Sequence, residues 1–172
     1  MGSPKLETDP KRIEELARRM EDANWDFRSF LKGSDLPIGE IDSLVHEHYR
    51  EIASHIDCRQ CANCCRVARP ILKSRDINRL SARLGIGEDK FREEYLEKDE
   101  DDEGYSFRSN PCAFLKENRC TVYPQRPDDC RSFPHLRKKD FVFRLSQAFS
   151  NCSICFSFIA MFSAARLATL AR

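Results

Sequence analysis

The sequence lacks the features that direct a chain into or across a membrane. Its first residues, Met1 to Lys5, contain no apolar signal region, and no apolar run reaches the length that spans a bilayer. The longest such run, 154–165, ends at Arg166 and predicts a buried helix. We therefore expect a cytoplasmic protein without a membrane partner, in a reducing compartment that disfavours a disulfide framework.

Other absences exclude further classes of protein. The net charge is only +1, so no global field attracts nucleic acid, and we expect no nucleic-acid partner. No glycine-rich loop follows a predicted strand, so the chain has no recognisable cradle for a nucleotide-like cofactor. The sequence shows no repeat and no second domain, and a length of 172 residues suits one domain.

Cysteine is the residue that the chain has in excess. Nine cysteines occur in 172 residues, and four of them fall between Cys58 and Cys65. Packing does not require this number, because twelve Phe and many Leu and Ile can supply a core. Soft thiolates are the preferred protein ligands of zinc, copper(I) and iron–sulfur clusters. The run Cys58-x-x-Cys61-x-x-Cys64-Cys65 therefore predicts a metal site.

Apolar periodicity predicts a mainly α fold with a few short β-strands, a small helical domain built around the cysteine-rich metal site. Residues 1–172 are expected to form a single domain with an N-terminal helical hairpin (1–57), a cysteine-cluster core (58–155) and a C-terminal helix (151–172). Cys152 and Cys155 are expected in the first turn of that last helix. The other expected elements are helices over about 10–32, 41–56, 74–84 and from 88, strands over 105–107, 120–123 and 141–145, and a helical turn at 127–134.

The charges are unevenly distributed along the chain. From Cys58 to Arg83 there are seven Lys or Arg against one acid, Asp76. From Glu88 to Glu103 there are ten acids against three bases. Solvated faces are the ordinary explanation of both. Alternatively, cations near a thiolate-rich site lower cysteine pKa values and stabilise an anionic cluster.

The later cysteines stand in a specific order of motifs. These are Pro111-Cys112-x-Phe114-Leu115, Cys120-x-x-Tyr123 and Arg126-Pro127-x-x-Cys130-Arg131-x-Phe133-Pro134. Together with the first run, they resemble the YkgJ-like CxxCxxCC cysteine-cluster family, which is described as a zinc- or iron-chelating domain. The resemblance covers Cys58 to about Cys152. Ala62 stands where relatives usually carry Gly, and Cys155 is additional to the family pattern.

The resemblance implies eight metal-ligating cysteines, which are Cys58, Cys61, Cys64, Cys65, Cys112, Cys120, Cys130 and Cys152. Neighbouring side chains of an extended chain point apart, so we expect one of Cys64 and Cys65 to face the ions and the other to bind elsewhere or pack. The intervals that separate Cys112, Cys120 and Cys130 are too long for a local knuckle. We therefore expect these three cysteines to meet the first run in one compact region, with Cys152 completing the shell. The apolar wall expected around the sulfurs comprises Phe114, Leu115, Tyr123 and Phe133.

The sequence leaves two kinds of metal centre open. Ferredoxin-like loops hold a 4Fe–4S cluster with three cysteines at C-x-x-C-x-x-C spacing and a remote fourth cysteine. In ferredoxins a proline follows the remote cysteine, whereas in this sequence a proline precedes Cys112. Eight cysteines would also fill two tetrahedral zinc sites. We favour an iron–sulfur cluster with a redox or accessory role. The alternative is a zinc-stabilised binding or structural module without catalysis.

The resemblance also implies a methylation-related enzyme or accessory as an alternative, because one branch of the family is associated with lysine N-methylation of flagellin. The sequence assigns no catalytic residue and leaves a protein partner open. Arg126 and Arg131 either pair with nearby acids or donate to sulfur or to an anionic substrate beside the cluster. His55 is close enough to Cys58 in sequence to be considered as a ligand, whereas His135 is expected to be packed or at the surface.

Overall fold

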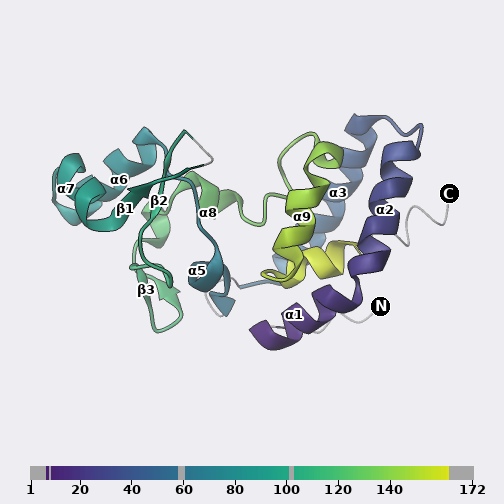
Figure 1. The fold of residues 1–172 in the computed structure, drawn as a ribbon, viewed down its shortest axis with the longest axis horizontal. Coiled ribbons are helices and arrows are strands. Elements are labelled where there is room, and N and C mark those ends of the chain that lie inside the picture. The colour runs from purple at the N-terminus through teal and green to yellow at the C-terminus, as the bar shows by residue number, and fades with distance from the viewer. Residues whose placement is uncertain (1–6, 8, 58–60, 101–102, 163–172) are drawn as a thin grey trace. The chain divides into compact units, whose positions relative to one another are not determined.

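The computed structural model describes residues 7, 9–57, 61–100 and 103–162. The chain divides into two compact units, which are unit 1 (Met1–Asp57 with Pro134–Arg172) and unit 2 (Cys58–Phe133). Each unit has an apolar core of its own. The fold is mainly α with a few short strands, as the sequence predicts (Figure 1). The association of these two units into the predicted single domain stays a prediction.

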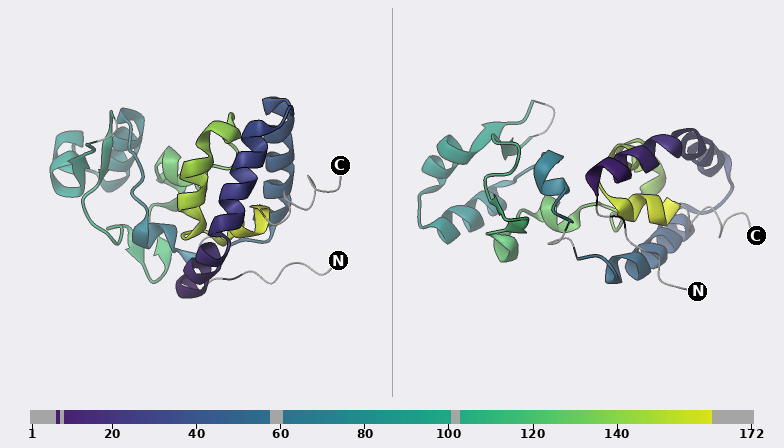
Figure 2. Two further views of the ribbon diagram at one scale, coloured as in Figure 1. Left: turned by 45° about the vertical axis from the view of Figure 1, so that its right-hand side comes forward. Right: turned by 90° about the horizontal axis from the view of Figure 1, so that it is seen from below.

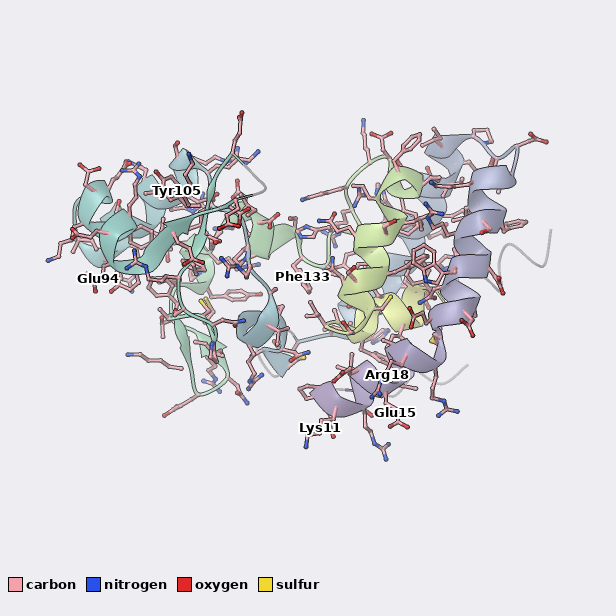
Figure 3. All side chains as sticks on the ribbon, viewed as in Figure 1. Lys11, Glu15, Arg18, Glu94, Tyr105 and Phe133 are labelled. Carbon is pink, nitrogen blue, oxygen red and sulfur yellow. The ribbon has the colours of Figure 1, made fainter. Side chains whose placement is uncertain are left out.

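Unit 1 is entirely helical over its described residues. Its elements are α1 (Pro10–Arg19), α2 (Glu21–Gly33), α3 (Ile38–Ser54), η2 (Phe141–Arg144), α9 (Leu145–Cys152) and a helical segment at 156–162. Helices α1 and α2 both pack against α9 (Figure 2). Polar side chains such as Lys11, Glu15 and Arg18 project from the exposed side of α1 (Figure 3), while Ile13 and Ala17 enter the core. Within the described part of the chain, no helix is long and apolar enough to cross a membrane.

The predicted helix over 10–32 is in fact two helices that meet at Met20. Neither proline nor glycine marks this break. The charges do, because α1 ends on Arg18 and Arg19 while α2 begins with Glu21 and Asp22. Because of the helix dipole, positively charged side chains stabilise the C-terminal end of a helix and negatively charged side chains stabilise its N-terminal end. The prediction of one continuous helix was therefore wrong at a point that the charge pattern marks.

The predicted strand over 141–145 was also wrong, because these residues form η2 and the start of α9. The cause is a buried carboxylate from α3. Asp42 accepts hydrogen bonds from the backbone N–H groups of Asp140, at 2.8 Å, and Phe141, at 2.9 Å. Asp140 has a φ of 59° and turns the chain into η2. The alternating apolar residues of 141–145 thus lie in helical turns, and the side chain of Asp42, distant in sequence, stabilises the start of these turns.

The last predicted helix begins later than expected. Helix α9 ends at Cys152, the chain turns through Ser153 and Ile154, and helix resumes at 156. Cys152 is therefore the last residue of one helix, and Cys155 precedes the next, so neither lies in the first turn of a helix from 151. The remainder of the predicted C-terminal helix, 163–172, lies outside the described residues.

Unit 2 combines short helices with two small antiparallel sheets. Its elements are α5 (Cys64–Val67), α6 (Ser74–Leu84), α7 (Glu88–Tyr95), β1 (Leu96–Lys98), β2 (Tyr105–Phe107), β3 (Leu115–Lys116), β4 (Arg119–Cys120), η1 (Tyr123–Gln125) and α8 (Asp128–Ser132). Strand β1 pairs with β2 and β3 pairs with β4. The core of unit 2 contains three mutually stacked rings, with centroid distances of 5.2 Å for Phe91–Tyr95, 5.3 Å for Tyr95–Phe114 and 6.4 Å for Phe91–Phe114.

Most expectations for unit 2 are confirmed. The helices at 74–84 and from 88, the strand at 105–107 and the helical turn between Pro127 and Pro134 all form. The strand expected over 120–123 is too long, because β4 ends at Cys120 and Tyr123 opens η1. Of the acidic connection between β1 and β2, residues 101 and 102 lie outside the described part of the chain.

Candidate metal centre

The first cysteine run enters unit 2 through a tight turn. Ala62 has a φ of 50°, in the left-handed region that favours glycine, and its side chain is buried. The backbone N–H of Cys65 then donates to the carbonyl of Ala62, at 3.1 Å, and α5 begins. The turn therefore explains why glycine suits this position. Cys58, the first predicted ligand, lies outside the described residues.

Cys64 and Cys65 lie in the helix α5, and the expectation of an extended chain at this point was wrong. Successive helical side chains diverge less than those of a strand, so the two thiols remain neighbours. A hydrogen bond from the Cys64 thiol, which outweighs the opposing effect of burial and is assisted by Arg66 and Arg126, lowers the pKa of Cys65 to about 7. Cys65 is thus the thiol of this pair that most readily becomes a thiolate.

A backbone hydrogen bond joins the second motif to the first. The N–H of Cys112 donates to the carbonyl of Cys65, at 2.9 Å, and the N–H of Leu115 donates to the carbonyl of Cys112, also at 2.9 Å. The chain then forms the β3–β4 hairpin, in which Leu115 pairs with Cys120. Its two turn residues, Glu117 and Asn118, have φ values of 48° and 61°, as a two-residue hairpin of matching twist requires. The hairpin returns Cys120 toward Cys112, and both pack against the core of unit 2.

A buried ion pair on α6 positions the turn that carries Cys130. The Asp76 side chain is only 1% exposed, and it accepts from the N–H groups of Lys73, at 3.1 Å, and Asp128, at 3.0 Å. It also pairs with Arg79, at 2.7 Å between Nη2 and Oδ1. Asp128 is the first residue of α8, and Cys130 is its third. The carboxylate of Asp76 therefore fixes the start of the helix that presents Cys130.

Arg79 extends this contact to the preceding corner of the chain. Its guanidinium donates to the carbonyls of Gln125, at 3.1 Å, and Arg126, at 2.9 Å, and pairs with Asp128 at 3.2 Å. On the other side of α8, Asp129 accepts from the N–H of Ile71, at 3.2 Å. We call Asp76, Arg79, Asp128 and Asp129 the α8 clamp. Sequence analysis missed these roles, although Asp76 stood out as the single acid in a basic stretch.

The thiols of Cys65, Cys112, Cys120 and Cys130 lie close enough to influence one another electrostatically. Burial, with smaller contributions from the charges of Cys65 and Cys120, raises the pKa of Cys112 to about 11. Burial likewise raises the pKa of Cys120, and that of Cys130 most of all, with neighbouring thiolate charges acting in the same direction. Cys112, Cys120 and Cys130 therefore lie near Cys65, whereas the predicted meeting of these cysteines with the first run in one compact metal-binding region stays a prediction.

The donor chemistry at this place suits a soft metal, because several thiols converge from three segments of unit 2. Within 61–100 and 103–162, no three His, Cys, Asp or Glu side chains stand in a metal-holding arrangement. Cys61 is half-buried, and its carbonyl accepts from Arg66 Nη1 at 3.0 Å. Which of these thiols ligate therefore stays a prediction.

Two expected members of the apolar wall differ in burial. Phe114 is 6% exposed and lies in the core, whereas Tyr123 is 36% exposed. The Tyr123 ring instead carries the guanidinium of Arg126, whose carbon lies 3.8 Å from the ring centroid. Leu115 and Phe133 are half-buried. The aromatic core thus covers the thiols through Phe114, and Tyr123 faces solvent.

The two predicted arginines have different surroundings. Arg126 donates to the carbonyl of Tyr123, at 2.8 Å, and its charge helps to lower the pKa of Cys65. Arg131 donates to the carbonyls of Arg126, at 3.1 Å, and Pro124, and it reaches Asp128 only at 3.9 Å. Arg126 therefore acts on the thiols, whereas Arg131 closes the turn before α8.

The remaining candidates belong to unit 1. Cys152 is 2% exposed in the core, where the Asn24 amide approaches its sulfur at 4.0 Å. The thiol of Cys155 lies 3.1 Å from Ser157 Oγ. His55 is exposed at the end of α3, and His135 is buried, with a φ of 68°. The proposed ligation by Cys152 stays a prediction.

Comparison with known protein families gives one match. The model of the CxxCxxCC family, described as "Putative zinc- or iron-chelating domain", matches residues 57–153, which is more than half of the chain. The match includes Cys152 and ends before Cys155. No curated protein and no solved structure matches the chain.

We predict that Asp76→Ala weakens metal binding by about 10- to 100-fold, as the loss of a residue that orients a metal ligand does elsewhere. The N–H of Asp128 and the Arg79 guanidinium lose a buried acceptor, so α8 no longer holds Cys130 in place. Competition with a chromophoric chelator, monitored on folded protein, measures the affinity.

Asp42→Ala is the matched control for this variant. Asp42 is also a buried carboxylate that accepts two backbone N–H groups, but it lies in unit 1. Its loss should lower the melting temperature, since each unsatisfied buried group costs about 1–3 kcal/mol, and leave the metal affinity within about twofold. Equal loss of metal in both variants would show that the clamp has no special role.

We also predict that Cys65 is alkylated before Cys112 in reduced, metal-free protein. At pH 7 about half of Cys65 is thiolate, whereas only about one Cys112 in 10⁴ is, and thiolate is the nucleophile. The rate at Cys65 should rise as the pH passes 7 and then level off. Peptide mapping after brief iodoacetamide treatment identifies the site, and preferential labelling of Cys112 would contradict the assignment.

Proposed function

We propose, because this chain belongs to the CxxCxxCC family of zinc- or iron-chelating domains, that its thiols hold an iron–sulfur cluster. The family makes it a metal-binding protein. The finer assignment, a 4Fe–4S cluster with a redox or accessory role, is our proposal. The observation that supports it is the hydrogen bond from the Cys112 N–H to the Cys65 carbonyl, with Cys120 and Cys130 near enough to these thiols for their charges to interact.

The number of thiols in unit 2 supports a cluster. Seven of the nine cysteines belong to Cys58–Phe133, and they come from one continuous run, one hairpin and one helical turn. A structural zinc site is closed by four ligands, commonly from two separated pairs. A run of three cysteines with remote partners is instead the arrangement that wraps a cubane cluster. The proposed ligands are the eight cysteines Cys58, Cys61, Cys64, Cys65, Cys112, Cys120, Cys130 and Cys152.

The surroundings of the thiols also support a cluster. Phe114 and the stacked rings behind it exclude water from one side, and a dry environment tunes the potential of a cluster. Arg66 and Arg126 place positive charge beside Cys65, which favours the thiolate that a metal requires. When bound, an iron–sulfur cluster would supply one-electron transfer. The residues of this chain hold the thiolates, exclude water and, through the α8 clamp, orient Cys130.

Zinc is the second candidate, and one observation favours it. Four thiols, those of Cys65, Cys112, Cys120 and Cys130, influence one another directly, and four thiolates satisfy a tetrahedral zinc ion. In that case the metal would only stabilise the fold of a binding module. A methylation-related role rests on the family resemblance and has no support from a specific contact.

We expect protein purified without oxygen to be brown and to contain iron and acid-labile sulfide in similar amounts. Iron–thiolate charge transfer gives the colour, and sulfide distinguishes a cluster from isolated iron. Absorption spectra with metal and sulfide analysis of the same sample provide the measurement. Colourless protein with stoichiometric zinc and no sulfide would reverse the order of the two candidates.

We further predict that Cys61→Ser, Cys112→Ser and Cys130→Ser each lose metal and become less soluble, because metal binding and folding are coupled. Cys155→Ser is the control, since Cys155 lies outside the family match. It should keep its metal, and equal damage there would show that the ligand set is wrong.

Cys152 needs a different substitution because it is part of an apolar core. Cys152→Ala preserves a small apolar side chain and removes only the sulfur. Loss of metal from folded Cys152→Ala protein would support ligation, whereas full metal content would remove Cys152 from the set.

A further inference from the structure

Positively charged side chains surround the thiols on the exposed side of unit 2. Arg66 of α5 donates to the side-chain oxygen of Asn118, which joins α5 to the tip of the β3–β4 hairpin. Lys116 and Arg119 flank that tip and are exposed. Arg126 lies near Cys65 and Cys120: its charge helps to lower the pKa of Cys65 and opposes, without overcoming, the burial that raises the pKa of Cys120. We call Arg66, Lys116, Arg119 and Arg126 the cationic rim.

The two arginines nearest the thiols donate hydrogen bonds to neutral groups. Arg66 donates to the carbonyl of Cys61, at 3.0 Å, and to the Asn118 amide. Arg126 donates to the carbonyl of Tyr123, at 2.8 Å, and lies over its ring. Hydrogen bonds to neutral acceptors do not cancel a guanidinium charge. Both side chains therefore remain positively charged beside the thiols.

Glu117 lies between Lys116 and Arg119 at the hairpin tip and offsets part of their charge, while the densest run of acids in unit 2 lies elsewhere. The connection between β1 and β2 carries Asp99, Glu100 and Glu103, and it lies at the opposite end of the unit from the β3–β4 hairpin (Figures 1 and 2). Thiolates partly offset the charge of Arg66 and Arg126, since these arginines face Cys65. Lys116 and Arg119, at the exposed end of the hairpin, provide the outward charge of the rim.

The shape and chemistry of the rim indicate the kind of partner. Lys116 and Arg119 are exposed on the hairpin, whereas a cavity of about 300 Å³ beside Trp25 is lined by residues of unit 1. Single-stranded nucleic acid needs free aromatic faces, and the Arg126 guanidinium already covers a face of Tyr123. Exposed Val67 and Tyr123 add apolar area beside the cations. A protein surface rich in carboxylates fits these features.

We infer that the cationic rim docks an acidic protein beside the metal centre. This inference rests on the proposed function, because a cluster that exchanges electrons needs a partner within reach. Interfaces of electron-transfer proteins are small and depend on complementary charge. Lys116 and Arg119 steer the acidic surface, and Arg66 and Arg126 lie between it and the thiols.

The test uses a fluorescein-labelled oligoglutamate peptide as the acidic probe and the full chain purified without oxygen. Fluorescence anisotropy should show binding at low ionic strength that weakens with added salt. The double variant Lys116→Glu/Arg119→Glu should weaken binding about tenfold, because two attractive charges become repulsive. The matched control is Lys11→Glu/Arg12→Glu on α1, which reverses the same two residue types at exposed positions of unit 1 and should change binding less than about twofold.

Three results would overturn the docking surface. They are no binding of the peptide, equal losses in the two double variants, and tighter binding of an oligouridine RNA than of oligoglutamate through Lys116 and Arg119. Iron content, measured on the same samples, reports the proposed function separately. If iron-loaded protein does not bind the peptide, the docking surface is contradicted and the cluster is not. If iron-free protein binds the peptide through the hairpin, the cluster is contradicted and the docking surface is not.

Discussion

The buried carboxylate of Asp76 is the contact on which the arrangement of the thiols depends. An isolated charge in a protein interior is costly, so a carboxylate with 1% of its surface exposed must be paired and hydrogen-bonded. Asp76 meets this requirement through the N–H of Lys73 and the guanidinium of Arg79 in its own segment, and through the N–H of Asp128 in α8. The contact with Asp128 sets the start of α8 and therefore the place of Cys130. A stability requirement of one helix thus becomes a positional requirement for a proposed metal ligand.

Backbone contacts set the positions of Cys112 and Cys120. Cys112 is tied to Cys65 by a main-chain hydrogen bond, and a two-residue hairpin turn sets the return of Cys120. None of these contacts depends on the thiol itself. The backbone at these cysteines is therefore positioned by contacts other than the sulfurs, and a bound metal would add to the stability of the fold.

The thiols fall into two groups by the direction in which their pKa is shifted. Burial raises the pKa of Cys112, Cys120 and Cys130, so these groups resist ionisation when no cation is near. Cys65 is the opposite, because the hydrogen bond from Cys64, with the charge of Arg66, stabilises its thiolate. A coordinating metal ion deprotonates thiols outright and would overcome the resistance of the buried group. Cys65 would therefore offer a metal its thiolate most readily of these four thiols.

The sequence by itself determined the helical class, the helices at 74–84 and from 88, and the family. The helices follow from local spacing, because apolar periodicity and turn residues act within a few residues of the chain. The break at Met20 was also local, although only the charges of Arg19 and Glu21 mark it. The tertiary structure alone decided where buried carboxylates bind. Asp42 meets the N–H of Asp140, 98 residues away, and Asp76 meets that of Asp128, 52 residues away. No local pattern encodes such a pairing, because it arises only when the folded core brings a lone carboxylate to a turn with unsatisfied N–H groups.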